Sequence, residues 1–225
     1  FRKYPGKNLA SHIIGNVDSE GKGVSGIELS MQKQLSKSND VSLSINAGIQ
    51  NILRNLISSQ INKFEAEGAA GILMDINNGE ILSLVSIPDF NLNQRENLDD
   101  KKFINRATKG VYELGSVFKT FTIAAGLNYN LISPTDIFTN IEKQMKCGGR
   151  TISEYDENLP KDLSVEDILI NSSNIGSVKI GQIVGTEKMR EFLGLIGITD
   201  KMEFDIEEIG SPLSFKWRDC KLKTV

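Results

Sequence analysis

The sequence has little of the material from which metal centres, redox sites and membrane spans are built. Among its 225 residues there is one histidine, His12, and there are two cysteines, Cys147 and Cys220. These numbers exclude a site with several imidazoles, a four-thiolate zinc site and a disulfide scaffold, and they disfavour a Ser-His-Asp triad. No apolar run approaches the roughly 18 residues that a membrane-spanning helix needs.

An excess of positive charge is also missing. Lysine and arginine together number 26, and aspartate and glutamate number 29, so the formal net charge is −3. A mildly acidic chain has no overall attraction for nucleic acid, and no nucleic-acid partner is expected. The chain is 39% hydrophobic and 24% charged, which is typical of a globular protein with a core and argues against disorder.

The two ends of the sequence suggest an internal piece of a longer protein. The chain opens at Phe1 without a start methionine or a charged-then-apolar leader, and it stops at Val225 without a turn or a helix cap. The lack of an anchoring segment here therefore says little about the parent protein.

Hydrophobic periodicity in the first half predicts an α+β fold. Residues 41–45 alternate apolar and polar side chains, as a half-buried strand does, and residues 49–64 carry one apolar stripe at helical spacing. Two apolar runs, 70–76 and 80–87, flank an Asn-Gly pair, which is a strong hairpin signal because both residues tolerate positive φ. Strand, helix and antiparallel hairpin in this order differ from a βαβ series.

The second half is predicted to be mainly helical. A helix is expected over residues 116–127, and residues 140–163 are expected to be polar and irregular. Residues 164–167 have the pattern of a capping box that opens a short helix, and two further helices are expected over 175–184 and 186–195.

A serine and a lysine form the first chemical candidate. Ser116 and Lys119 are three residues apart at an expected helix start, which places both side chains on one face. Apolar neighbours such as Phe118 and Phe121 could desolvate the lysine, favour its neutral form and make it a base for the serine hydroxyl. The N–H groups of a helix start also suit a developing oxyanion. The spacing alone is common, and a capping serine beside a solvated lysine is the competing interpretation.

Four small polar residues, Asn-Ser-Ser-Asn at 171–174, form the second candidate. They stand between Ile170 and Ile175, so that, if buried, they need hydrogen-bond partners or must face a cleft. The competing interpretation is a loop that joins two helices and caps the second of them.

A third motif carries less weight. Residues 21–26 fit the dinucleotide-binding pattern G-x-G-x-x-G, but polar residues 18–20 separate them from the preceding apolar run. That motif needs a strand that enters the turn directly, so no cofactor is expected, and no metal ion.

Further residues around the two polar clusters carry a family resemblance. Residues 105–107 (Asn-Arg-Ala) precede the Ser-x-x-Lys of 116–119, residues 75–82 form the expected hairpin turn, and residues 172–176 read Ser-Ser-Asn-Ile-Gly. In this order they resemble class B penicillin-binding proteins, the peptidoglycan D,D-transpeptidases of bacterial cell elongation and division. The Asn-Arg-Ala element most resembles the division-specific septal enzymes. Several of the first 28 residues resemble the end of the family's non-catalytic pedestal.

The resemblance implies a role for each of four residues. Ser116 would attack the D-Ala-D-Ala carbonyl, and Lys119 would take its proton. Ser172 would relay a proton to the leaving D-alanine, and Asn174 would hold the substrate amide and the lysine. Ser116, Ser172 and Asn174 would therefore also bind substrate, and β-lactams would acylate Ser116.

The resemblance also implies an architecture and a setting. The fold would be that of the penicillin-binding-protein and serine β-lactamase transpeptidases. Residues 1–40 would end the pedestal domain and residues 41–225 would begin the transpeptidase domain. The protein would be periplasmic and anchored in the inner membrane. It would bind peptidoglycan stem peptides and β-lactams, with a membrane-embedded glycosyltransferase and division proteins as partners.

Two features depart from the family pattern. Leu114 replaces the proline common before the Gly-Ser pair, which should alter only the turn. The Lys-Thr/Ser-Gly strand is missing, because Lys223-Thr224 is followed by Val225 and comes too soon after Asn174. We expect this strand beyond the present chain. The chain alone is expected to be inactive, since one lost oxyanion donor can cost ~10²–10³ in rate.

Two other functions remain open from the sequence. One is a D,D-carboxypeptidase or β-lactamase, a hydrolase with the same nucleophile, although the pedestal-like residues 1–40 count against it. The other is a non-catalytic β-lactam-binding sensor or division scaffold, which would use the same residues for binding.

Overall fold

The structure, a computed structural model, describes residues 2–94, 101–147 and 149–213, and these form two compact units. The described residues of the first unit are 2–94, 101–111 and 201–211. Those of the second unit are 112–147, 149–200 and 212–213. Both units combine helices with antiparallel strand pairs, which confirms the α+β prediction. No helix in the described part of the chain is long and apolar enough to cross a bilayer.

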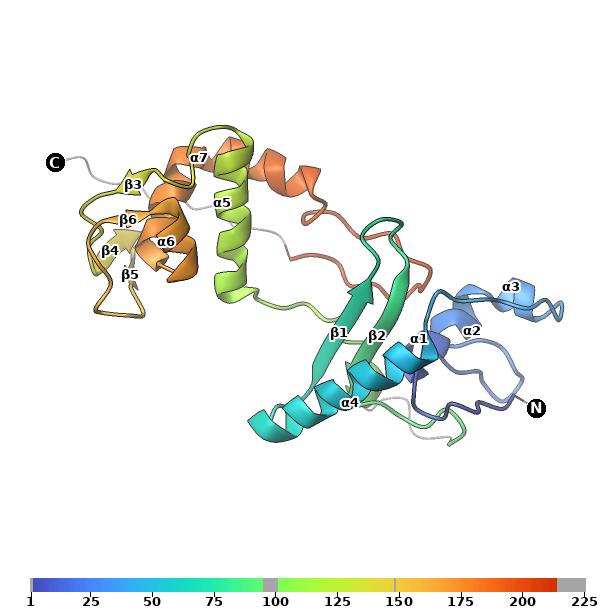
Figure 1. The fold of residues 1–225 in the computed structure, drawn as a ribbon. Coiled ribbons are helices and arrows are strands. Elements are labelled where there is room, and N and C mark those ends of the chain that lie inside the picture. The colour runs from blue at the N-terminus through green and yellow to red at the C-terminus, as the bar shows by residue number, and fades with distance from the viewer. Residues whose placement is uncertain (1, 95–100, 148, 214–225) are drawn as a thin grey trace. The chain divides into compact units, whose positions relative to one another are not determined.

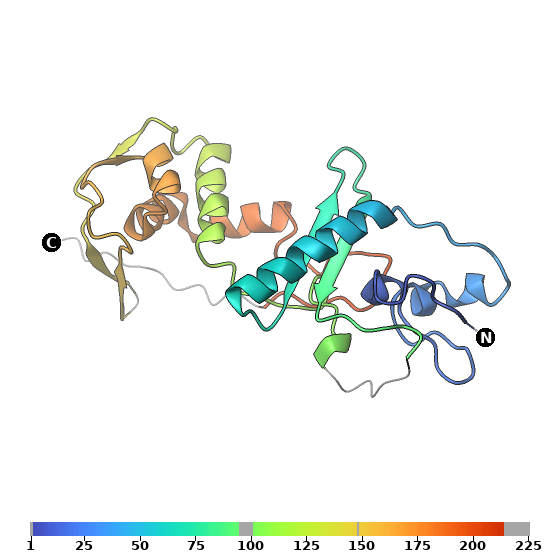
Figure 2. The ribbon, with the colours of Figure 1, turned by 60° about the horizontal axis from the view of Figure 1, so that its bottom comes forward.

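An antiparallel hairpin and one long helix form the centre of the first unit. Strands β1 (Ala69–Met74) and β2 (Ile81–Ile87) pair as the Asn-Gly signal predicts, and Gly79 in the turn has φ 78°. Helix α4 (Ala47–Phe64) crosses one face of this hairpin (Figures 1 and 2). The predicted helix and hairpin are therefore confirmed.

The apolar residues of α4 do not all lie on its covered face, in contrast to the single stripe that we expected. Ile52, Leu56 and Phe64 are 60%, 58% and 69% exposed. The side of α4 that packs on the hairpin carries Gln50, whose amide donates to the Leu84 carbonyl and accepts from the Leu84 N–H. A buried polar side chain satisfied by the strand thus holds the helix in place.

The predicted strand over residues 41–45 is wrong. This segment forms no strand pair but runs along the end of the hairpin, where the Ser44 hydroxyl donates to the Ile81 carbonyl. Two of its apolar side chains, Val41 and Ile45, still pack on a cluster of residues from both sides of residue 40, whereas Leu43 is exposed. The buried members of that cluster are Ile13, Ile27, Leu84 and Ile206.

Two short helices contribute Ile13 and Ile27 to this cluster. The domain boundary expected at residue 40 stays a prediction. The short elements of the first unit are α1 (Ser11–Ile14), α2 (Gly26–Ser30), α3 (Gln32–Leu35) and the 3-10 turn η1 (Lys101–Phe103).

Three helices dominate the second unit. The 3-10 turn η2 (Gly115–Phe118) leads into α5 (Lys119–Asn128), and α6 (Val165–Ile170) precedes α7 (Asn174–Leu195). Ser164 and Asp167 form the predicted capping box at the start of α6. The two helices predicted after residue 174 are also present, because Gly185, with φ 75° and ψ 164°, interrupts α7 between them.

The segment expected to be irregular contains short strands. Strands β4 (Gln144–Cys147) and β5 (Arg150–Ser153) form an antiparallel hairpin, and β3 (Ile137–Phe138) pairs with β6 (Leu163–Ser164). Each strand of the hairpin has four residues, too few for periodicity to distinguish it from a polar loop.

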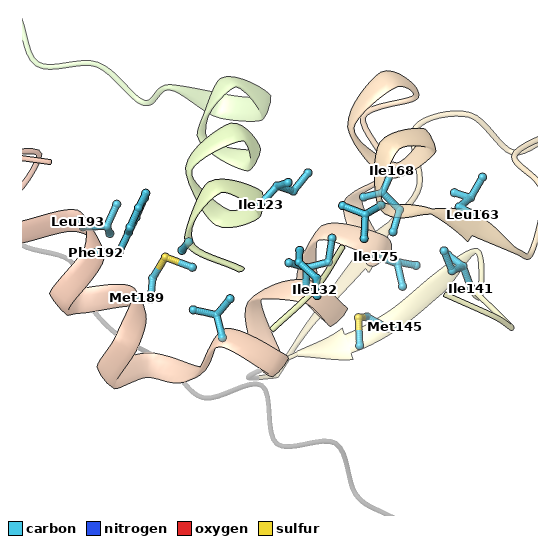
Figure 3. Close-up of a cluster of buried hydrophobic side chains, with 14 residues drawn as sticks. Ile123, Ile132, Ile141, Met145, Leu163, Ile168, Ile175, Met189, Phe192 and Leu193 are labelled. Carbon is cyan, nitrogen blue, oxygen red and sulfur yellow. The ribbon is translucent and has the colours of Figure 1, made fainter. Parts of the chain in front are cut away.

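The core of the second unit joins α5, α6, α7 and the β4–β5 hairpin (Figure 3). Close packing is visible at Gly126, where a Cβ would lie 2.6 Å from Ile132 Cδ1. Helices α5 and α7 pack side by side (Figure 1). Fully buried members of this core include Ala125, Ile168, Ile180 and Leu193.

Candidate active site

A tight turn presents Ser116 one step before α5. Ser116 lies in the 3-10 turn η2 and is exposed, and the Lys119 N–H donates to its carbonyl. In a 3-10 turn the side chains at i and i+3 lie above one another, so Ser116 and Lys119 share one face. Gly115 has φ 56°, a conformation that favours glycine. Leu114 has φ −69°, a value that a proline would also adopt.

The amine of Lys119 is held by the second polar cluster. Its Nζ lies 2.5 Å from the Ser172 carbonyl oxygen, 2.9 Å from Ser172 Oγ and 2.6 Å from Asn174 Oδ1. Burial lowers the pKa of the Lys119 ammonium below its usual value, and the negative charge of Glu154 raises it again in part. The neighbouring rings of Phe118 and Phe121 meet edge to face, with 5.7 Å between their centroids.

The loop over residues 171–174 satisfies both sequence interpretations at once. Ser173 is the N-cap of α7, and its hydroxyl oxygen accepts from the Gly176 N–H at 2.9 Å. Ser172 has φ 53°, a left-handed conformation that costs a non-glycine residue free energy. With this backbone, both the carbonyl and the hydroxyl of Ser172 reach Lys119. The loop therefore caps a helix and also presents two of its side chains to the amine.

This set of partners accommodates the amine in either protonation state. The Ser172 carbonyl and Asn174 Oδ1 can only accept, whereas Ser172 Oγ can accept or donate. An ammonium donates to all three atoms, and a neutral amine donates to two of them and receives the Ser172 hydroxyl proton on its lone pair. The orientation of the Asn174 amide is fixed because its Nδ2 donates to the Ser153 carbonyl at 2.7 Å. The site can therefore exchange a proton between Lys119 and Ser172 without leaving a polar group unpaired.

Sequence reasoning missed Glu154, which immediately follows β5. Its Oε1 accepts from the Ser173 hydroxyl at 2.6 Å and from the Ile175 N–H at 2.9 Å, and its Oε2 accepts from the Asn174 N–H at 2.7 Å. The position of this carboxylate depends on the β4–β5 hairpin. Since that hairpin was not predicted, no local signal distinguished Glu154 from the other acidic residues of the same segment.

His12 and the glycine-rich segment 21–26 lie in the first unit. His12 is buried, with Nε2 2.7 Å from the Lys102 carbonyl oxygen and its ring edge-on to Phe90. In the glycine-rich segment, Gly23 bridges to Val17 and the Gly26 N–H donates to a glutamate carboxylate. No strand enters this segment, in agreement with its rejection as a nucleotide site.

Comparison with known proteins identifies the family that such a serine, lysine and Ser-x-Asn loop define. The model of the penicillin binding protein transpeptidase domain matches residues 69–221. The chain belongs to this family, and the resemblance to class B penicillin-binding proteins is confirmed.

Curated relatives match nearly the whole chain. It is 32% identical over 222 residues to the "Probable peptidoglycan D,D-transpeptidase FtsI" of Caulobacter vibrioides, a match that covers 96% of this chain and 37% of the relative. It is 27% identical over 247 residues to the "Probable peptidoglycan D,D-transpeptidase PenA" of Neisseria gonorrhoeae, covering 96% and 42%. The chain thus spans about two fifths of the length of these relatives.

Solved structures confirm the expected fold. Penicillin binding protein 3 from Mycobacterium tuberculosis superposes with a TM-score of 0.85 at 22% identity, over 97% of this chain and 52% of that one. The D,D-transpeptidase domain of a peptidoglycan glycosyltransferase from Eggerthella lenta gives a TM-score of 0.78 at 25% identity, over 95% and 51%. The first likeness is one of fold alone.

Proposed function

We propose that this chain supplies the nucleophile half of a peptidoglycan D,D-transpeptidase, which cross-links stem peptides through an acyl-serine intermediate. The observation that carries this proposal is the hydrogen bonding of Lys119 Nζ to Ser172 and Asn174, one 3-10 turn after Ser116. The names of the curated relatives, peptidoglycan D,D-transpeptidases, support the same reaction.

In the proposed reaction, Ser116 is the nucleophile and Lys119 its base. Ser116 Oγ forms a bond to the carbonyl carbon of the penultimate D-alanine while its proton passes to Lys119 Nζ. The peptide C–N bond then breaks, and the leaving D-alanine amine receives a proton through Ser172. An acceptor amine attacks the ester carbonyl carbon and loses a proton to the same relay, which returns it to Ser116 Oγ as the ester C–O bond breaks. Asn174 holds the lysine and the substrate amide throughout.

The setting of the reaction is part of the proposal. We take residues 1–40 as the end of a pedestal domain and residues 41–225 as the start of the transpeptidase domain. The substrates are stem peptides ending in D-Ala-D-Ala, and β-lactams acylate the same serine. The intact protein is anchored in the inner membrane with this part in the periplasm. Its partners are a membrane-embedded glycosyltransferase and division proteins, as for septal enzymes.

Labelled penicillin tests the proposal on the intact protein that carries this sequence. We expect a stable adduct on Ser116, found by mass spectrometry of the tryptic peptide, and no adduct in Ser116→Ala. Since Ser116 is exposed, this variant should unfold at the same temperature as the wild type. A wild-type protein that forms no adduct on Ser116 would refute the proposal.

Two further results would replace transpeptidation by another function. Rapid release of the label would identify a hydrolase. A stable adduct without transfer of a labelled stem peptide to an acceptor amine would identify a β-lactam-binding sensor. Transfer that is lost in Ser116→Ala is the result that we expect.

A further inference from the structure

Glu154 holds three consecutive residues where the loop that contacts Lys119 enters α7. Its two carboxylate oxygens accept from the Ser173 hydroxyl, the Asn174 N–H and the Ile175 N–H, all within 2.9 Å. All three partners are donors in this arrangement, so the geometry requires a group that only accepts. An ionised carboxylate at a helix N-terminus is also favoured by the helix dipole.

The strand hairpin fixes the place of this carboxylate. The Glu154 N–H donates to the Lys143 carbonyl at 3.0 Å, next to the β4–β5 pairing. The neighbouring Ser153 carbonyl accepts from the side chain of Asn174 at 2.7 Å. Glu154 therefore binds the backbone N–H of Asn174, and the neighbouring Ser153 binds the side-chain amide of the same asparagine.

We propose that Glu154 is a positioning residue, which fixes the 172–174 loop so that Ser172 and Asn174 converge on Lys119. This inference rests on the acyl-serine function proposed above. Glu154 does not touch the reacting atoms in this arrangement but acts through the loop. A displacement of about 1 Å at a reacting group can lower a rate by roughly a hundredfold, so the hold of Glu154 on the loop should be visible in the acylation rate.

The charge of Glu154 has a second, separable effect. Of the charged side chains in the described part of the second unit, Glu154 is the one whose charge changes the pKa of Lys119, and it raises it. Without this charge the neutral amine would prevail at lower pH. A displaced 172–174 loop would lower the acylation rate at every pH, whereas the loss of the Glu154 charge would move the midpoint of the pH profile.

The test measures acylation of the intact protein by a fluorescent penicillin as a function of pH. Glu154→Gln keeps the size of the side chain but turns an N–H toward the Asn174 N–H or the Ser173 hydroxyl. We expect its plateau rate to fall roughly tenfold to a hundredfold. The midpoint of its pH profile should move to lower pH. Glu154→Asp retains the charge, so its midpoint should stay in place while its plateau is intermediate.

Ser164→Ala is the matched control for stability. This variant removes the N-cap side chain of α6, which should lower the free energy of unfolding by about 1 kcal/mol. It leaves the partners of Lys119 in place. Thermal unfolding of all variants corrects the rates for the folded fraction. If Glu154→Gln does not fold, Glu154→Asp carries the test, and a wild-type plateau in that variant would overturn the proposal.

The outcomes separate this inference from the function on which it rests. If the wild type is not acylated on Ser116, the proposed function fails. If the wild type is acylated and Glu154→Gln has the same plateau and the same midpoint, the role of Glu154 is refuted. A slowing no greater than that in Ser164→Ala at equal folded fraction would show a purely structural role, and would refute it too.

Discussion

Asn174 holds Lys119 at 2.6 Å through its amide oxygen while its amide nitrogen is fixed, at 2.7 Å, on the carbonyl of Ser153. The amide therefore links the lysine to the β4–β5 hairpin, and it cannot rotate without placing two oxygens or two N–H groups against each other.

Asn174→Asp should slow acylation and shift its pH profile upward. The new carboxylate would place an oxygen against the Ser153 carbonyl, and its negative charge would stabilise the Lys119 ammonium and raise its pKa. We expect at least a roughly tenfold lower rate at neutral pH, since one pKa unit changes the neutral fraction about tenfold. Asn171→Asp makes the same change of charge at an exposed residue that contacts Asp167, and it should stay near the wild-type rate. If the pH profile of Asn174→Asp had the wild-type midpoint, the contact between residue 174 and the Lys119 amine would be contradicted.

The acylation rate of the wild type should rise with pH with a midpoint below the value of about 10.4 for free lysine. Burial disfavours the ammonium and lowers the pKa of Lys119, so the neutral amine forms at lower pH than in water. Stopped-flow fluorescence with a labelled penicillin, corrected for alkaline hydrolysis of the drug, measures this profile. Lys119→Arg cannot provide a neutral base and should lose ~10²–10⁴ in rate at every pH. If the acylation rate of Lys119→Arg still rose with pH as in the wild type, Lys119 would not be the base.

Gly176→Ala should destabilise the second unit and slow acylation. A Cβ at Gly176 would lie 2.7 Å from Ile168 Cγ1 and 2.8 Å from Ser173 Oγ, so either the core or the capping serine must move. Overpacking of this kind costs about 1–3 kcal/mol. In the same helix Gly181→Ala would meet Thr122 Cγ2 at 3.6 Å, an ordinary contact, and should be neutral or slightly stabilising. Equal melting temperatures for the two variants would disprove the packing argument.

Tyr4 in the first unit should lose its phenolic proton at higher pH than a free tyrosine does. Burial, and then the adjacent Glu28 carboxylate, raise the pKa of Tyr4 to about 12. The unfolded chain loses this proton near the usual value of about 10, so the free energy of unfolding should fall as pH rises between these two values. Phenolate absorbance, compared between the wild type and Tyr4→Phe, isolates this residue among four tyrosines. A difference spectrum with a midpoint near 10 would exclude the shift.

Local signals in the sequence were sufficient for much of the fold. The Asn-Gly turn, the capping box at Ser164 and the helical spacing in α4 each depend on residues within a few positions of one another. The side of α4 that is covered does not follow from its own residues. Ile52 and Leu56 are apolar but exposed, because the two-stranded hairpin contacts a different side of the helix.

The site was predicted in part. Ser116, Lys119, Ser172 and Asn174 came from motif spacing together with a family resemblance, and the structure joins the last two to the lysine across more than 50 residues of chain. Glu154 could not be found this way, because its role depends on a hairpin with only four residues in each strand. Whether such short strands form depends on the residues against which they pack, and the periodicity of the sequence does not reveal these contacts.

Every amide at the start of α7 already has a partner within the chain. Asn174 and Ile175 donate to Glu154, Gly176 donates to the Ser173 hydroxyl, and Ser177 donates to the Ser173 carbonyl. Helix starts commonly attract phosphate or carboxylate groups from ligands, but here a resident carboxylate takes that place. With this place taken, these four amides are not available to an anionic group of a ligand.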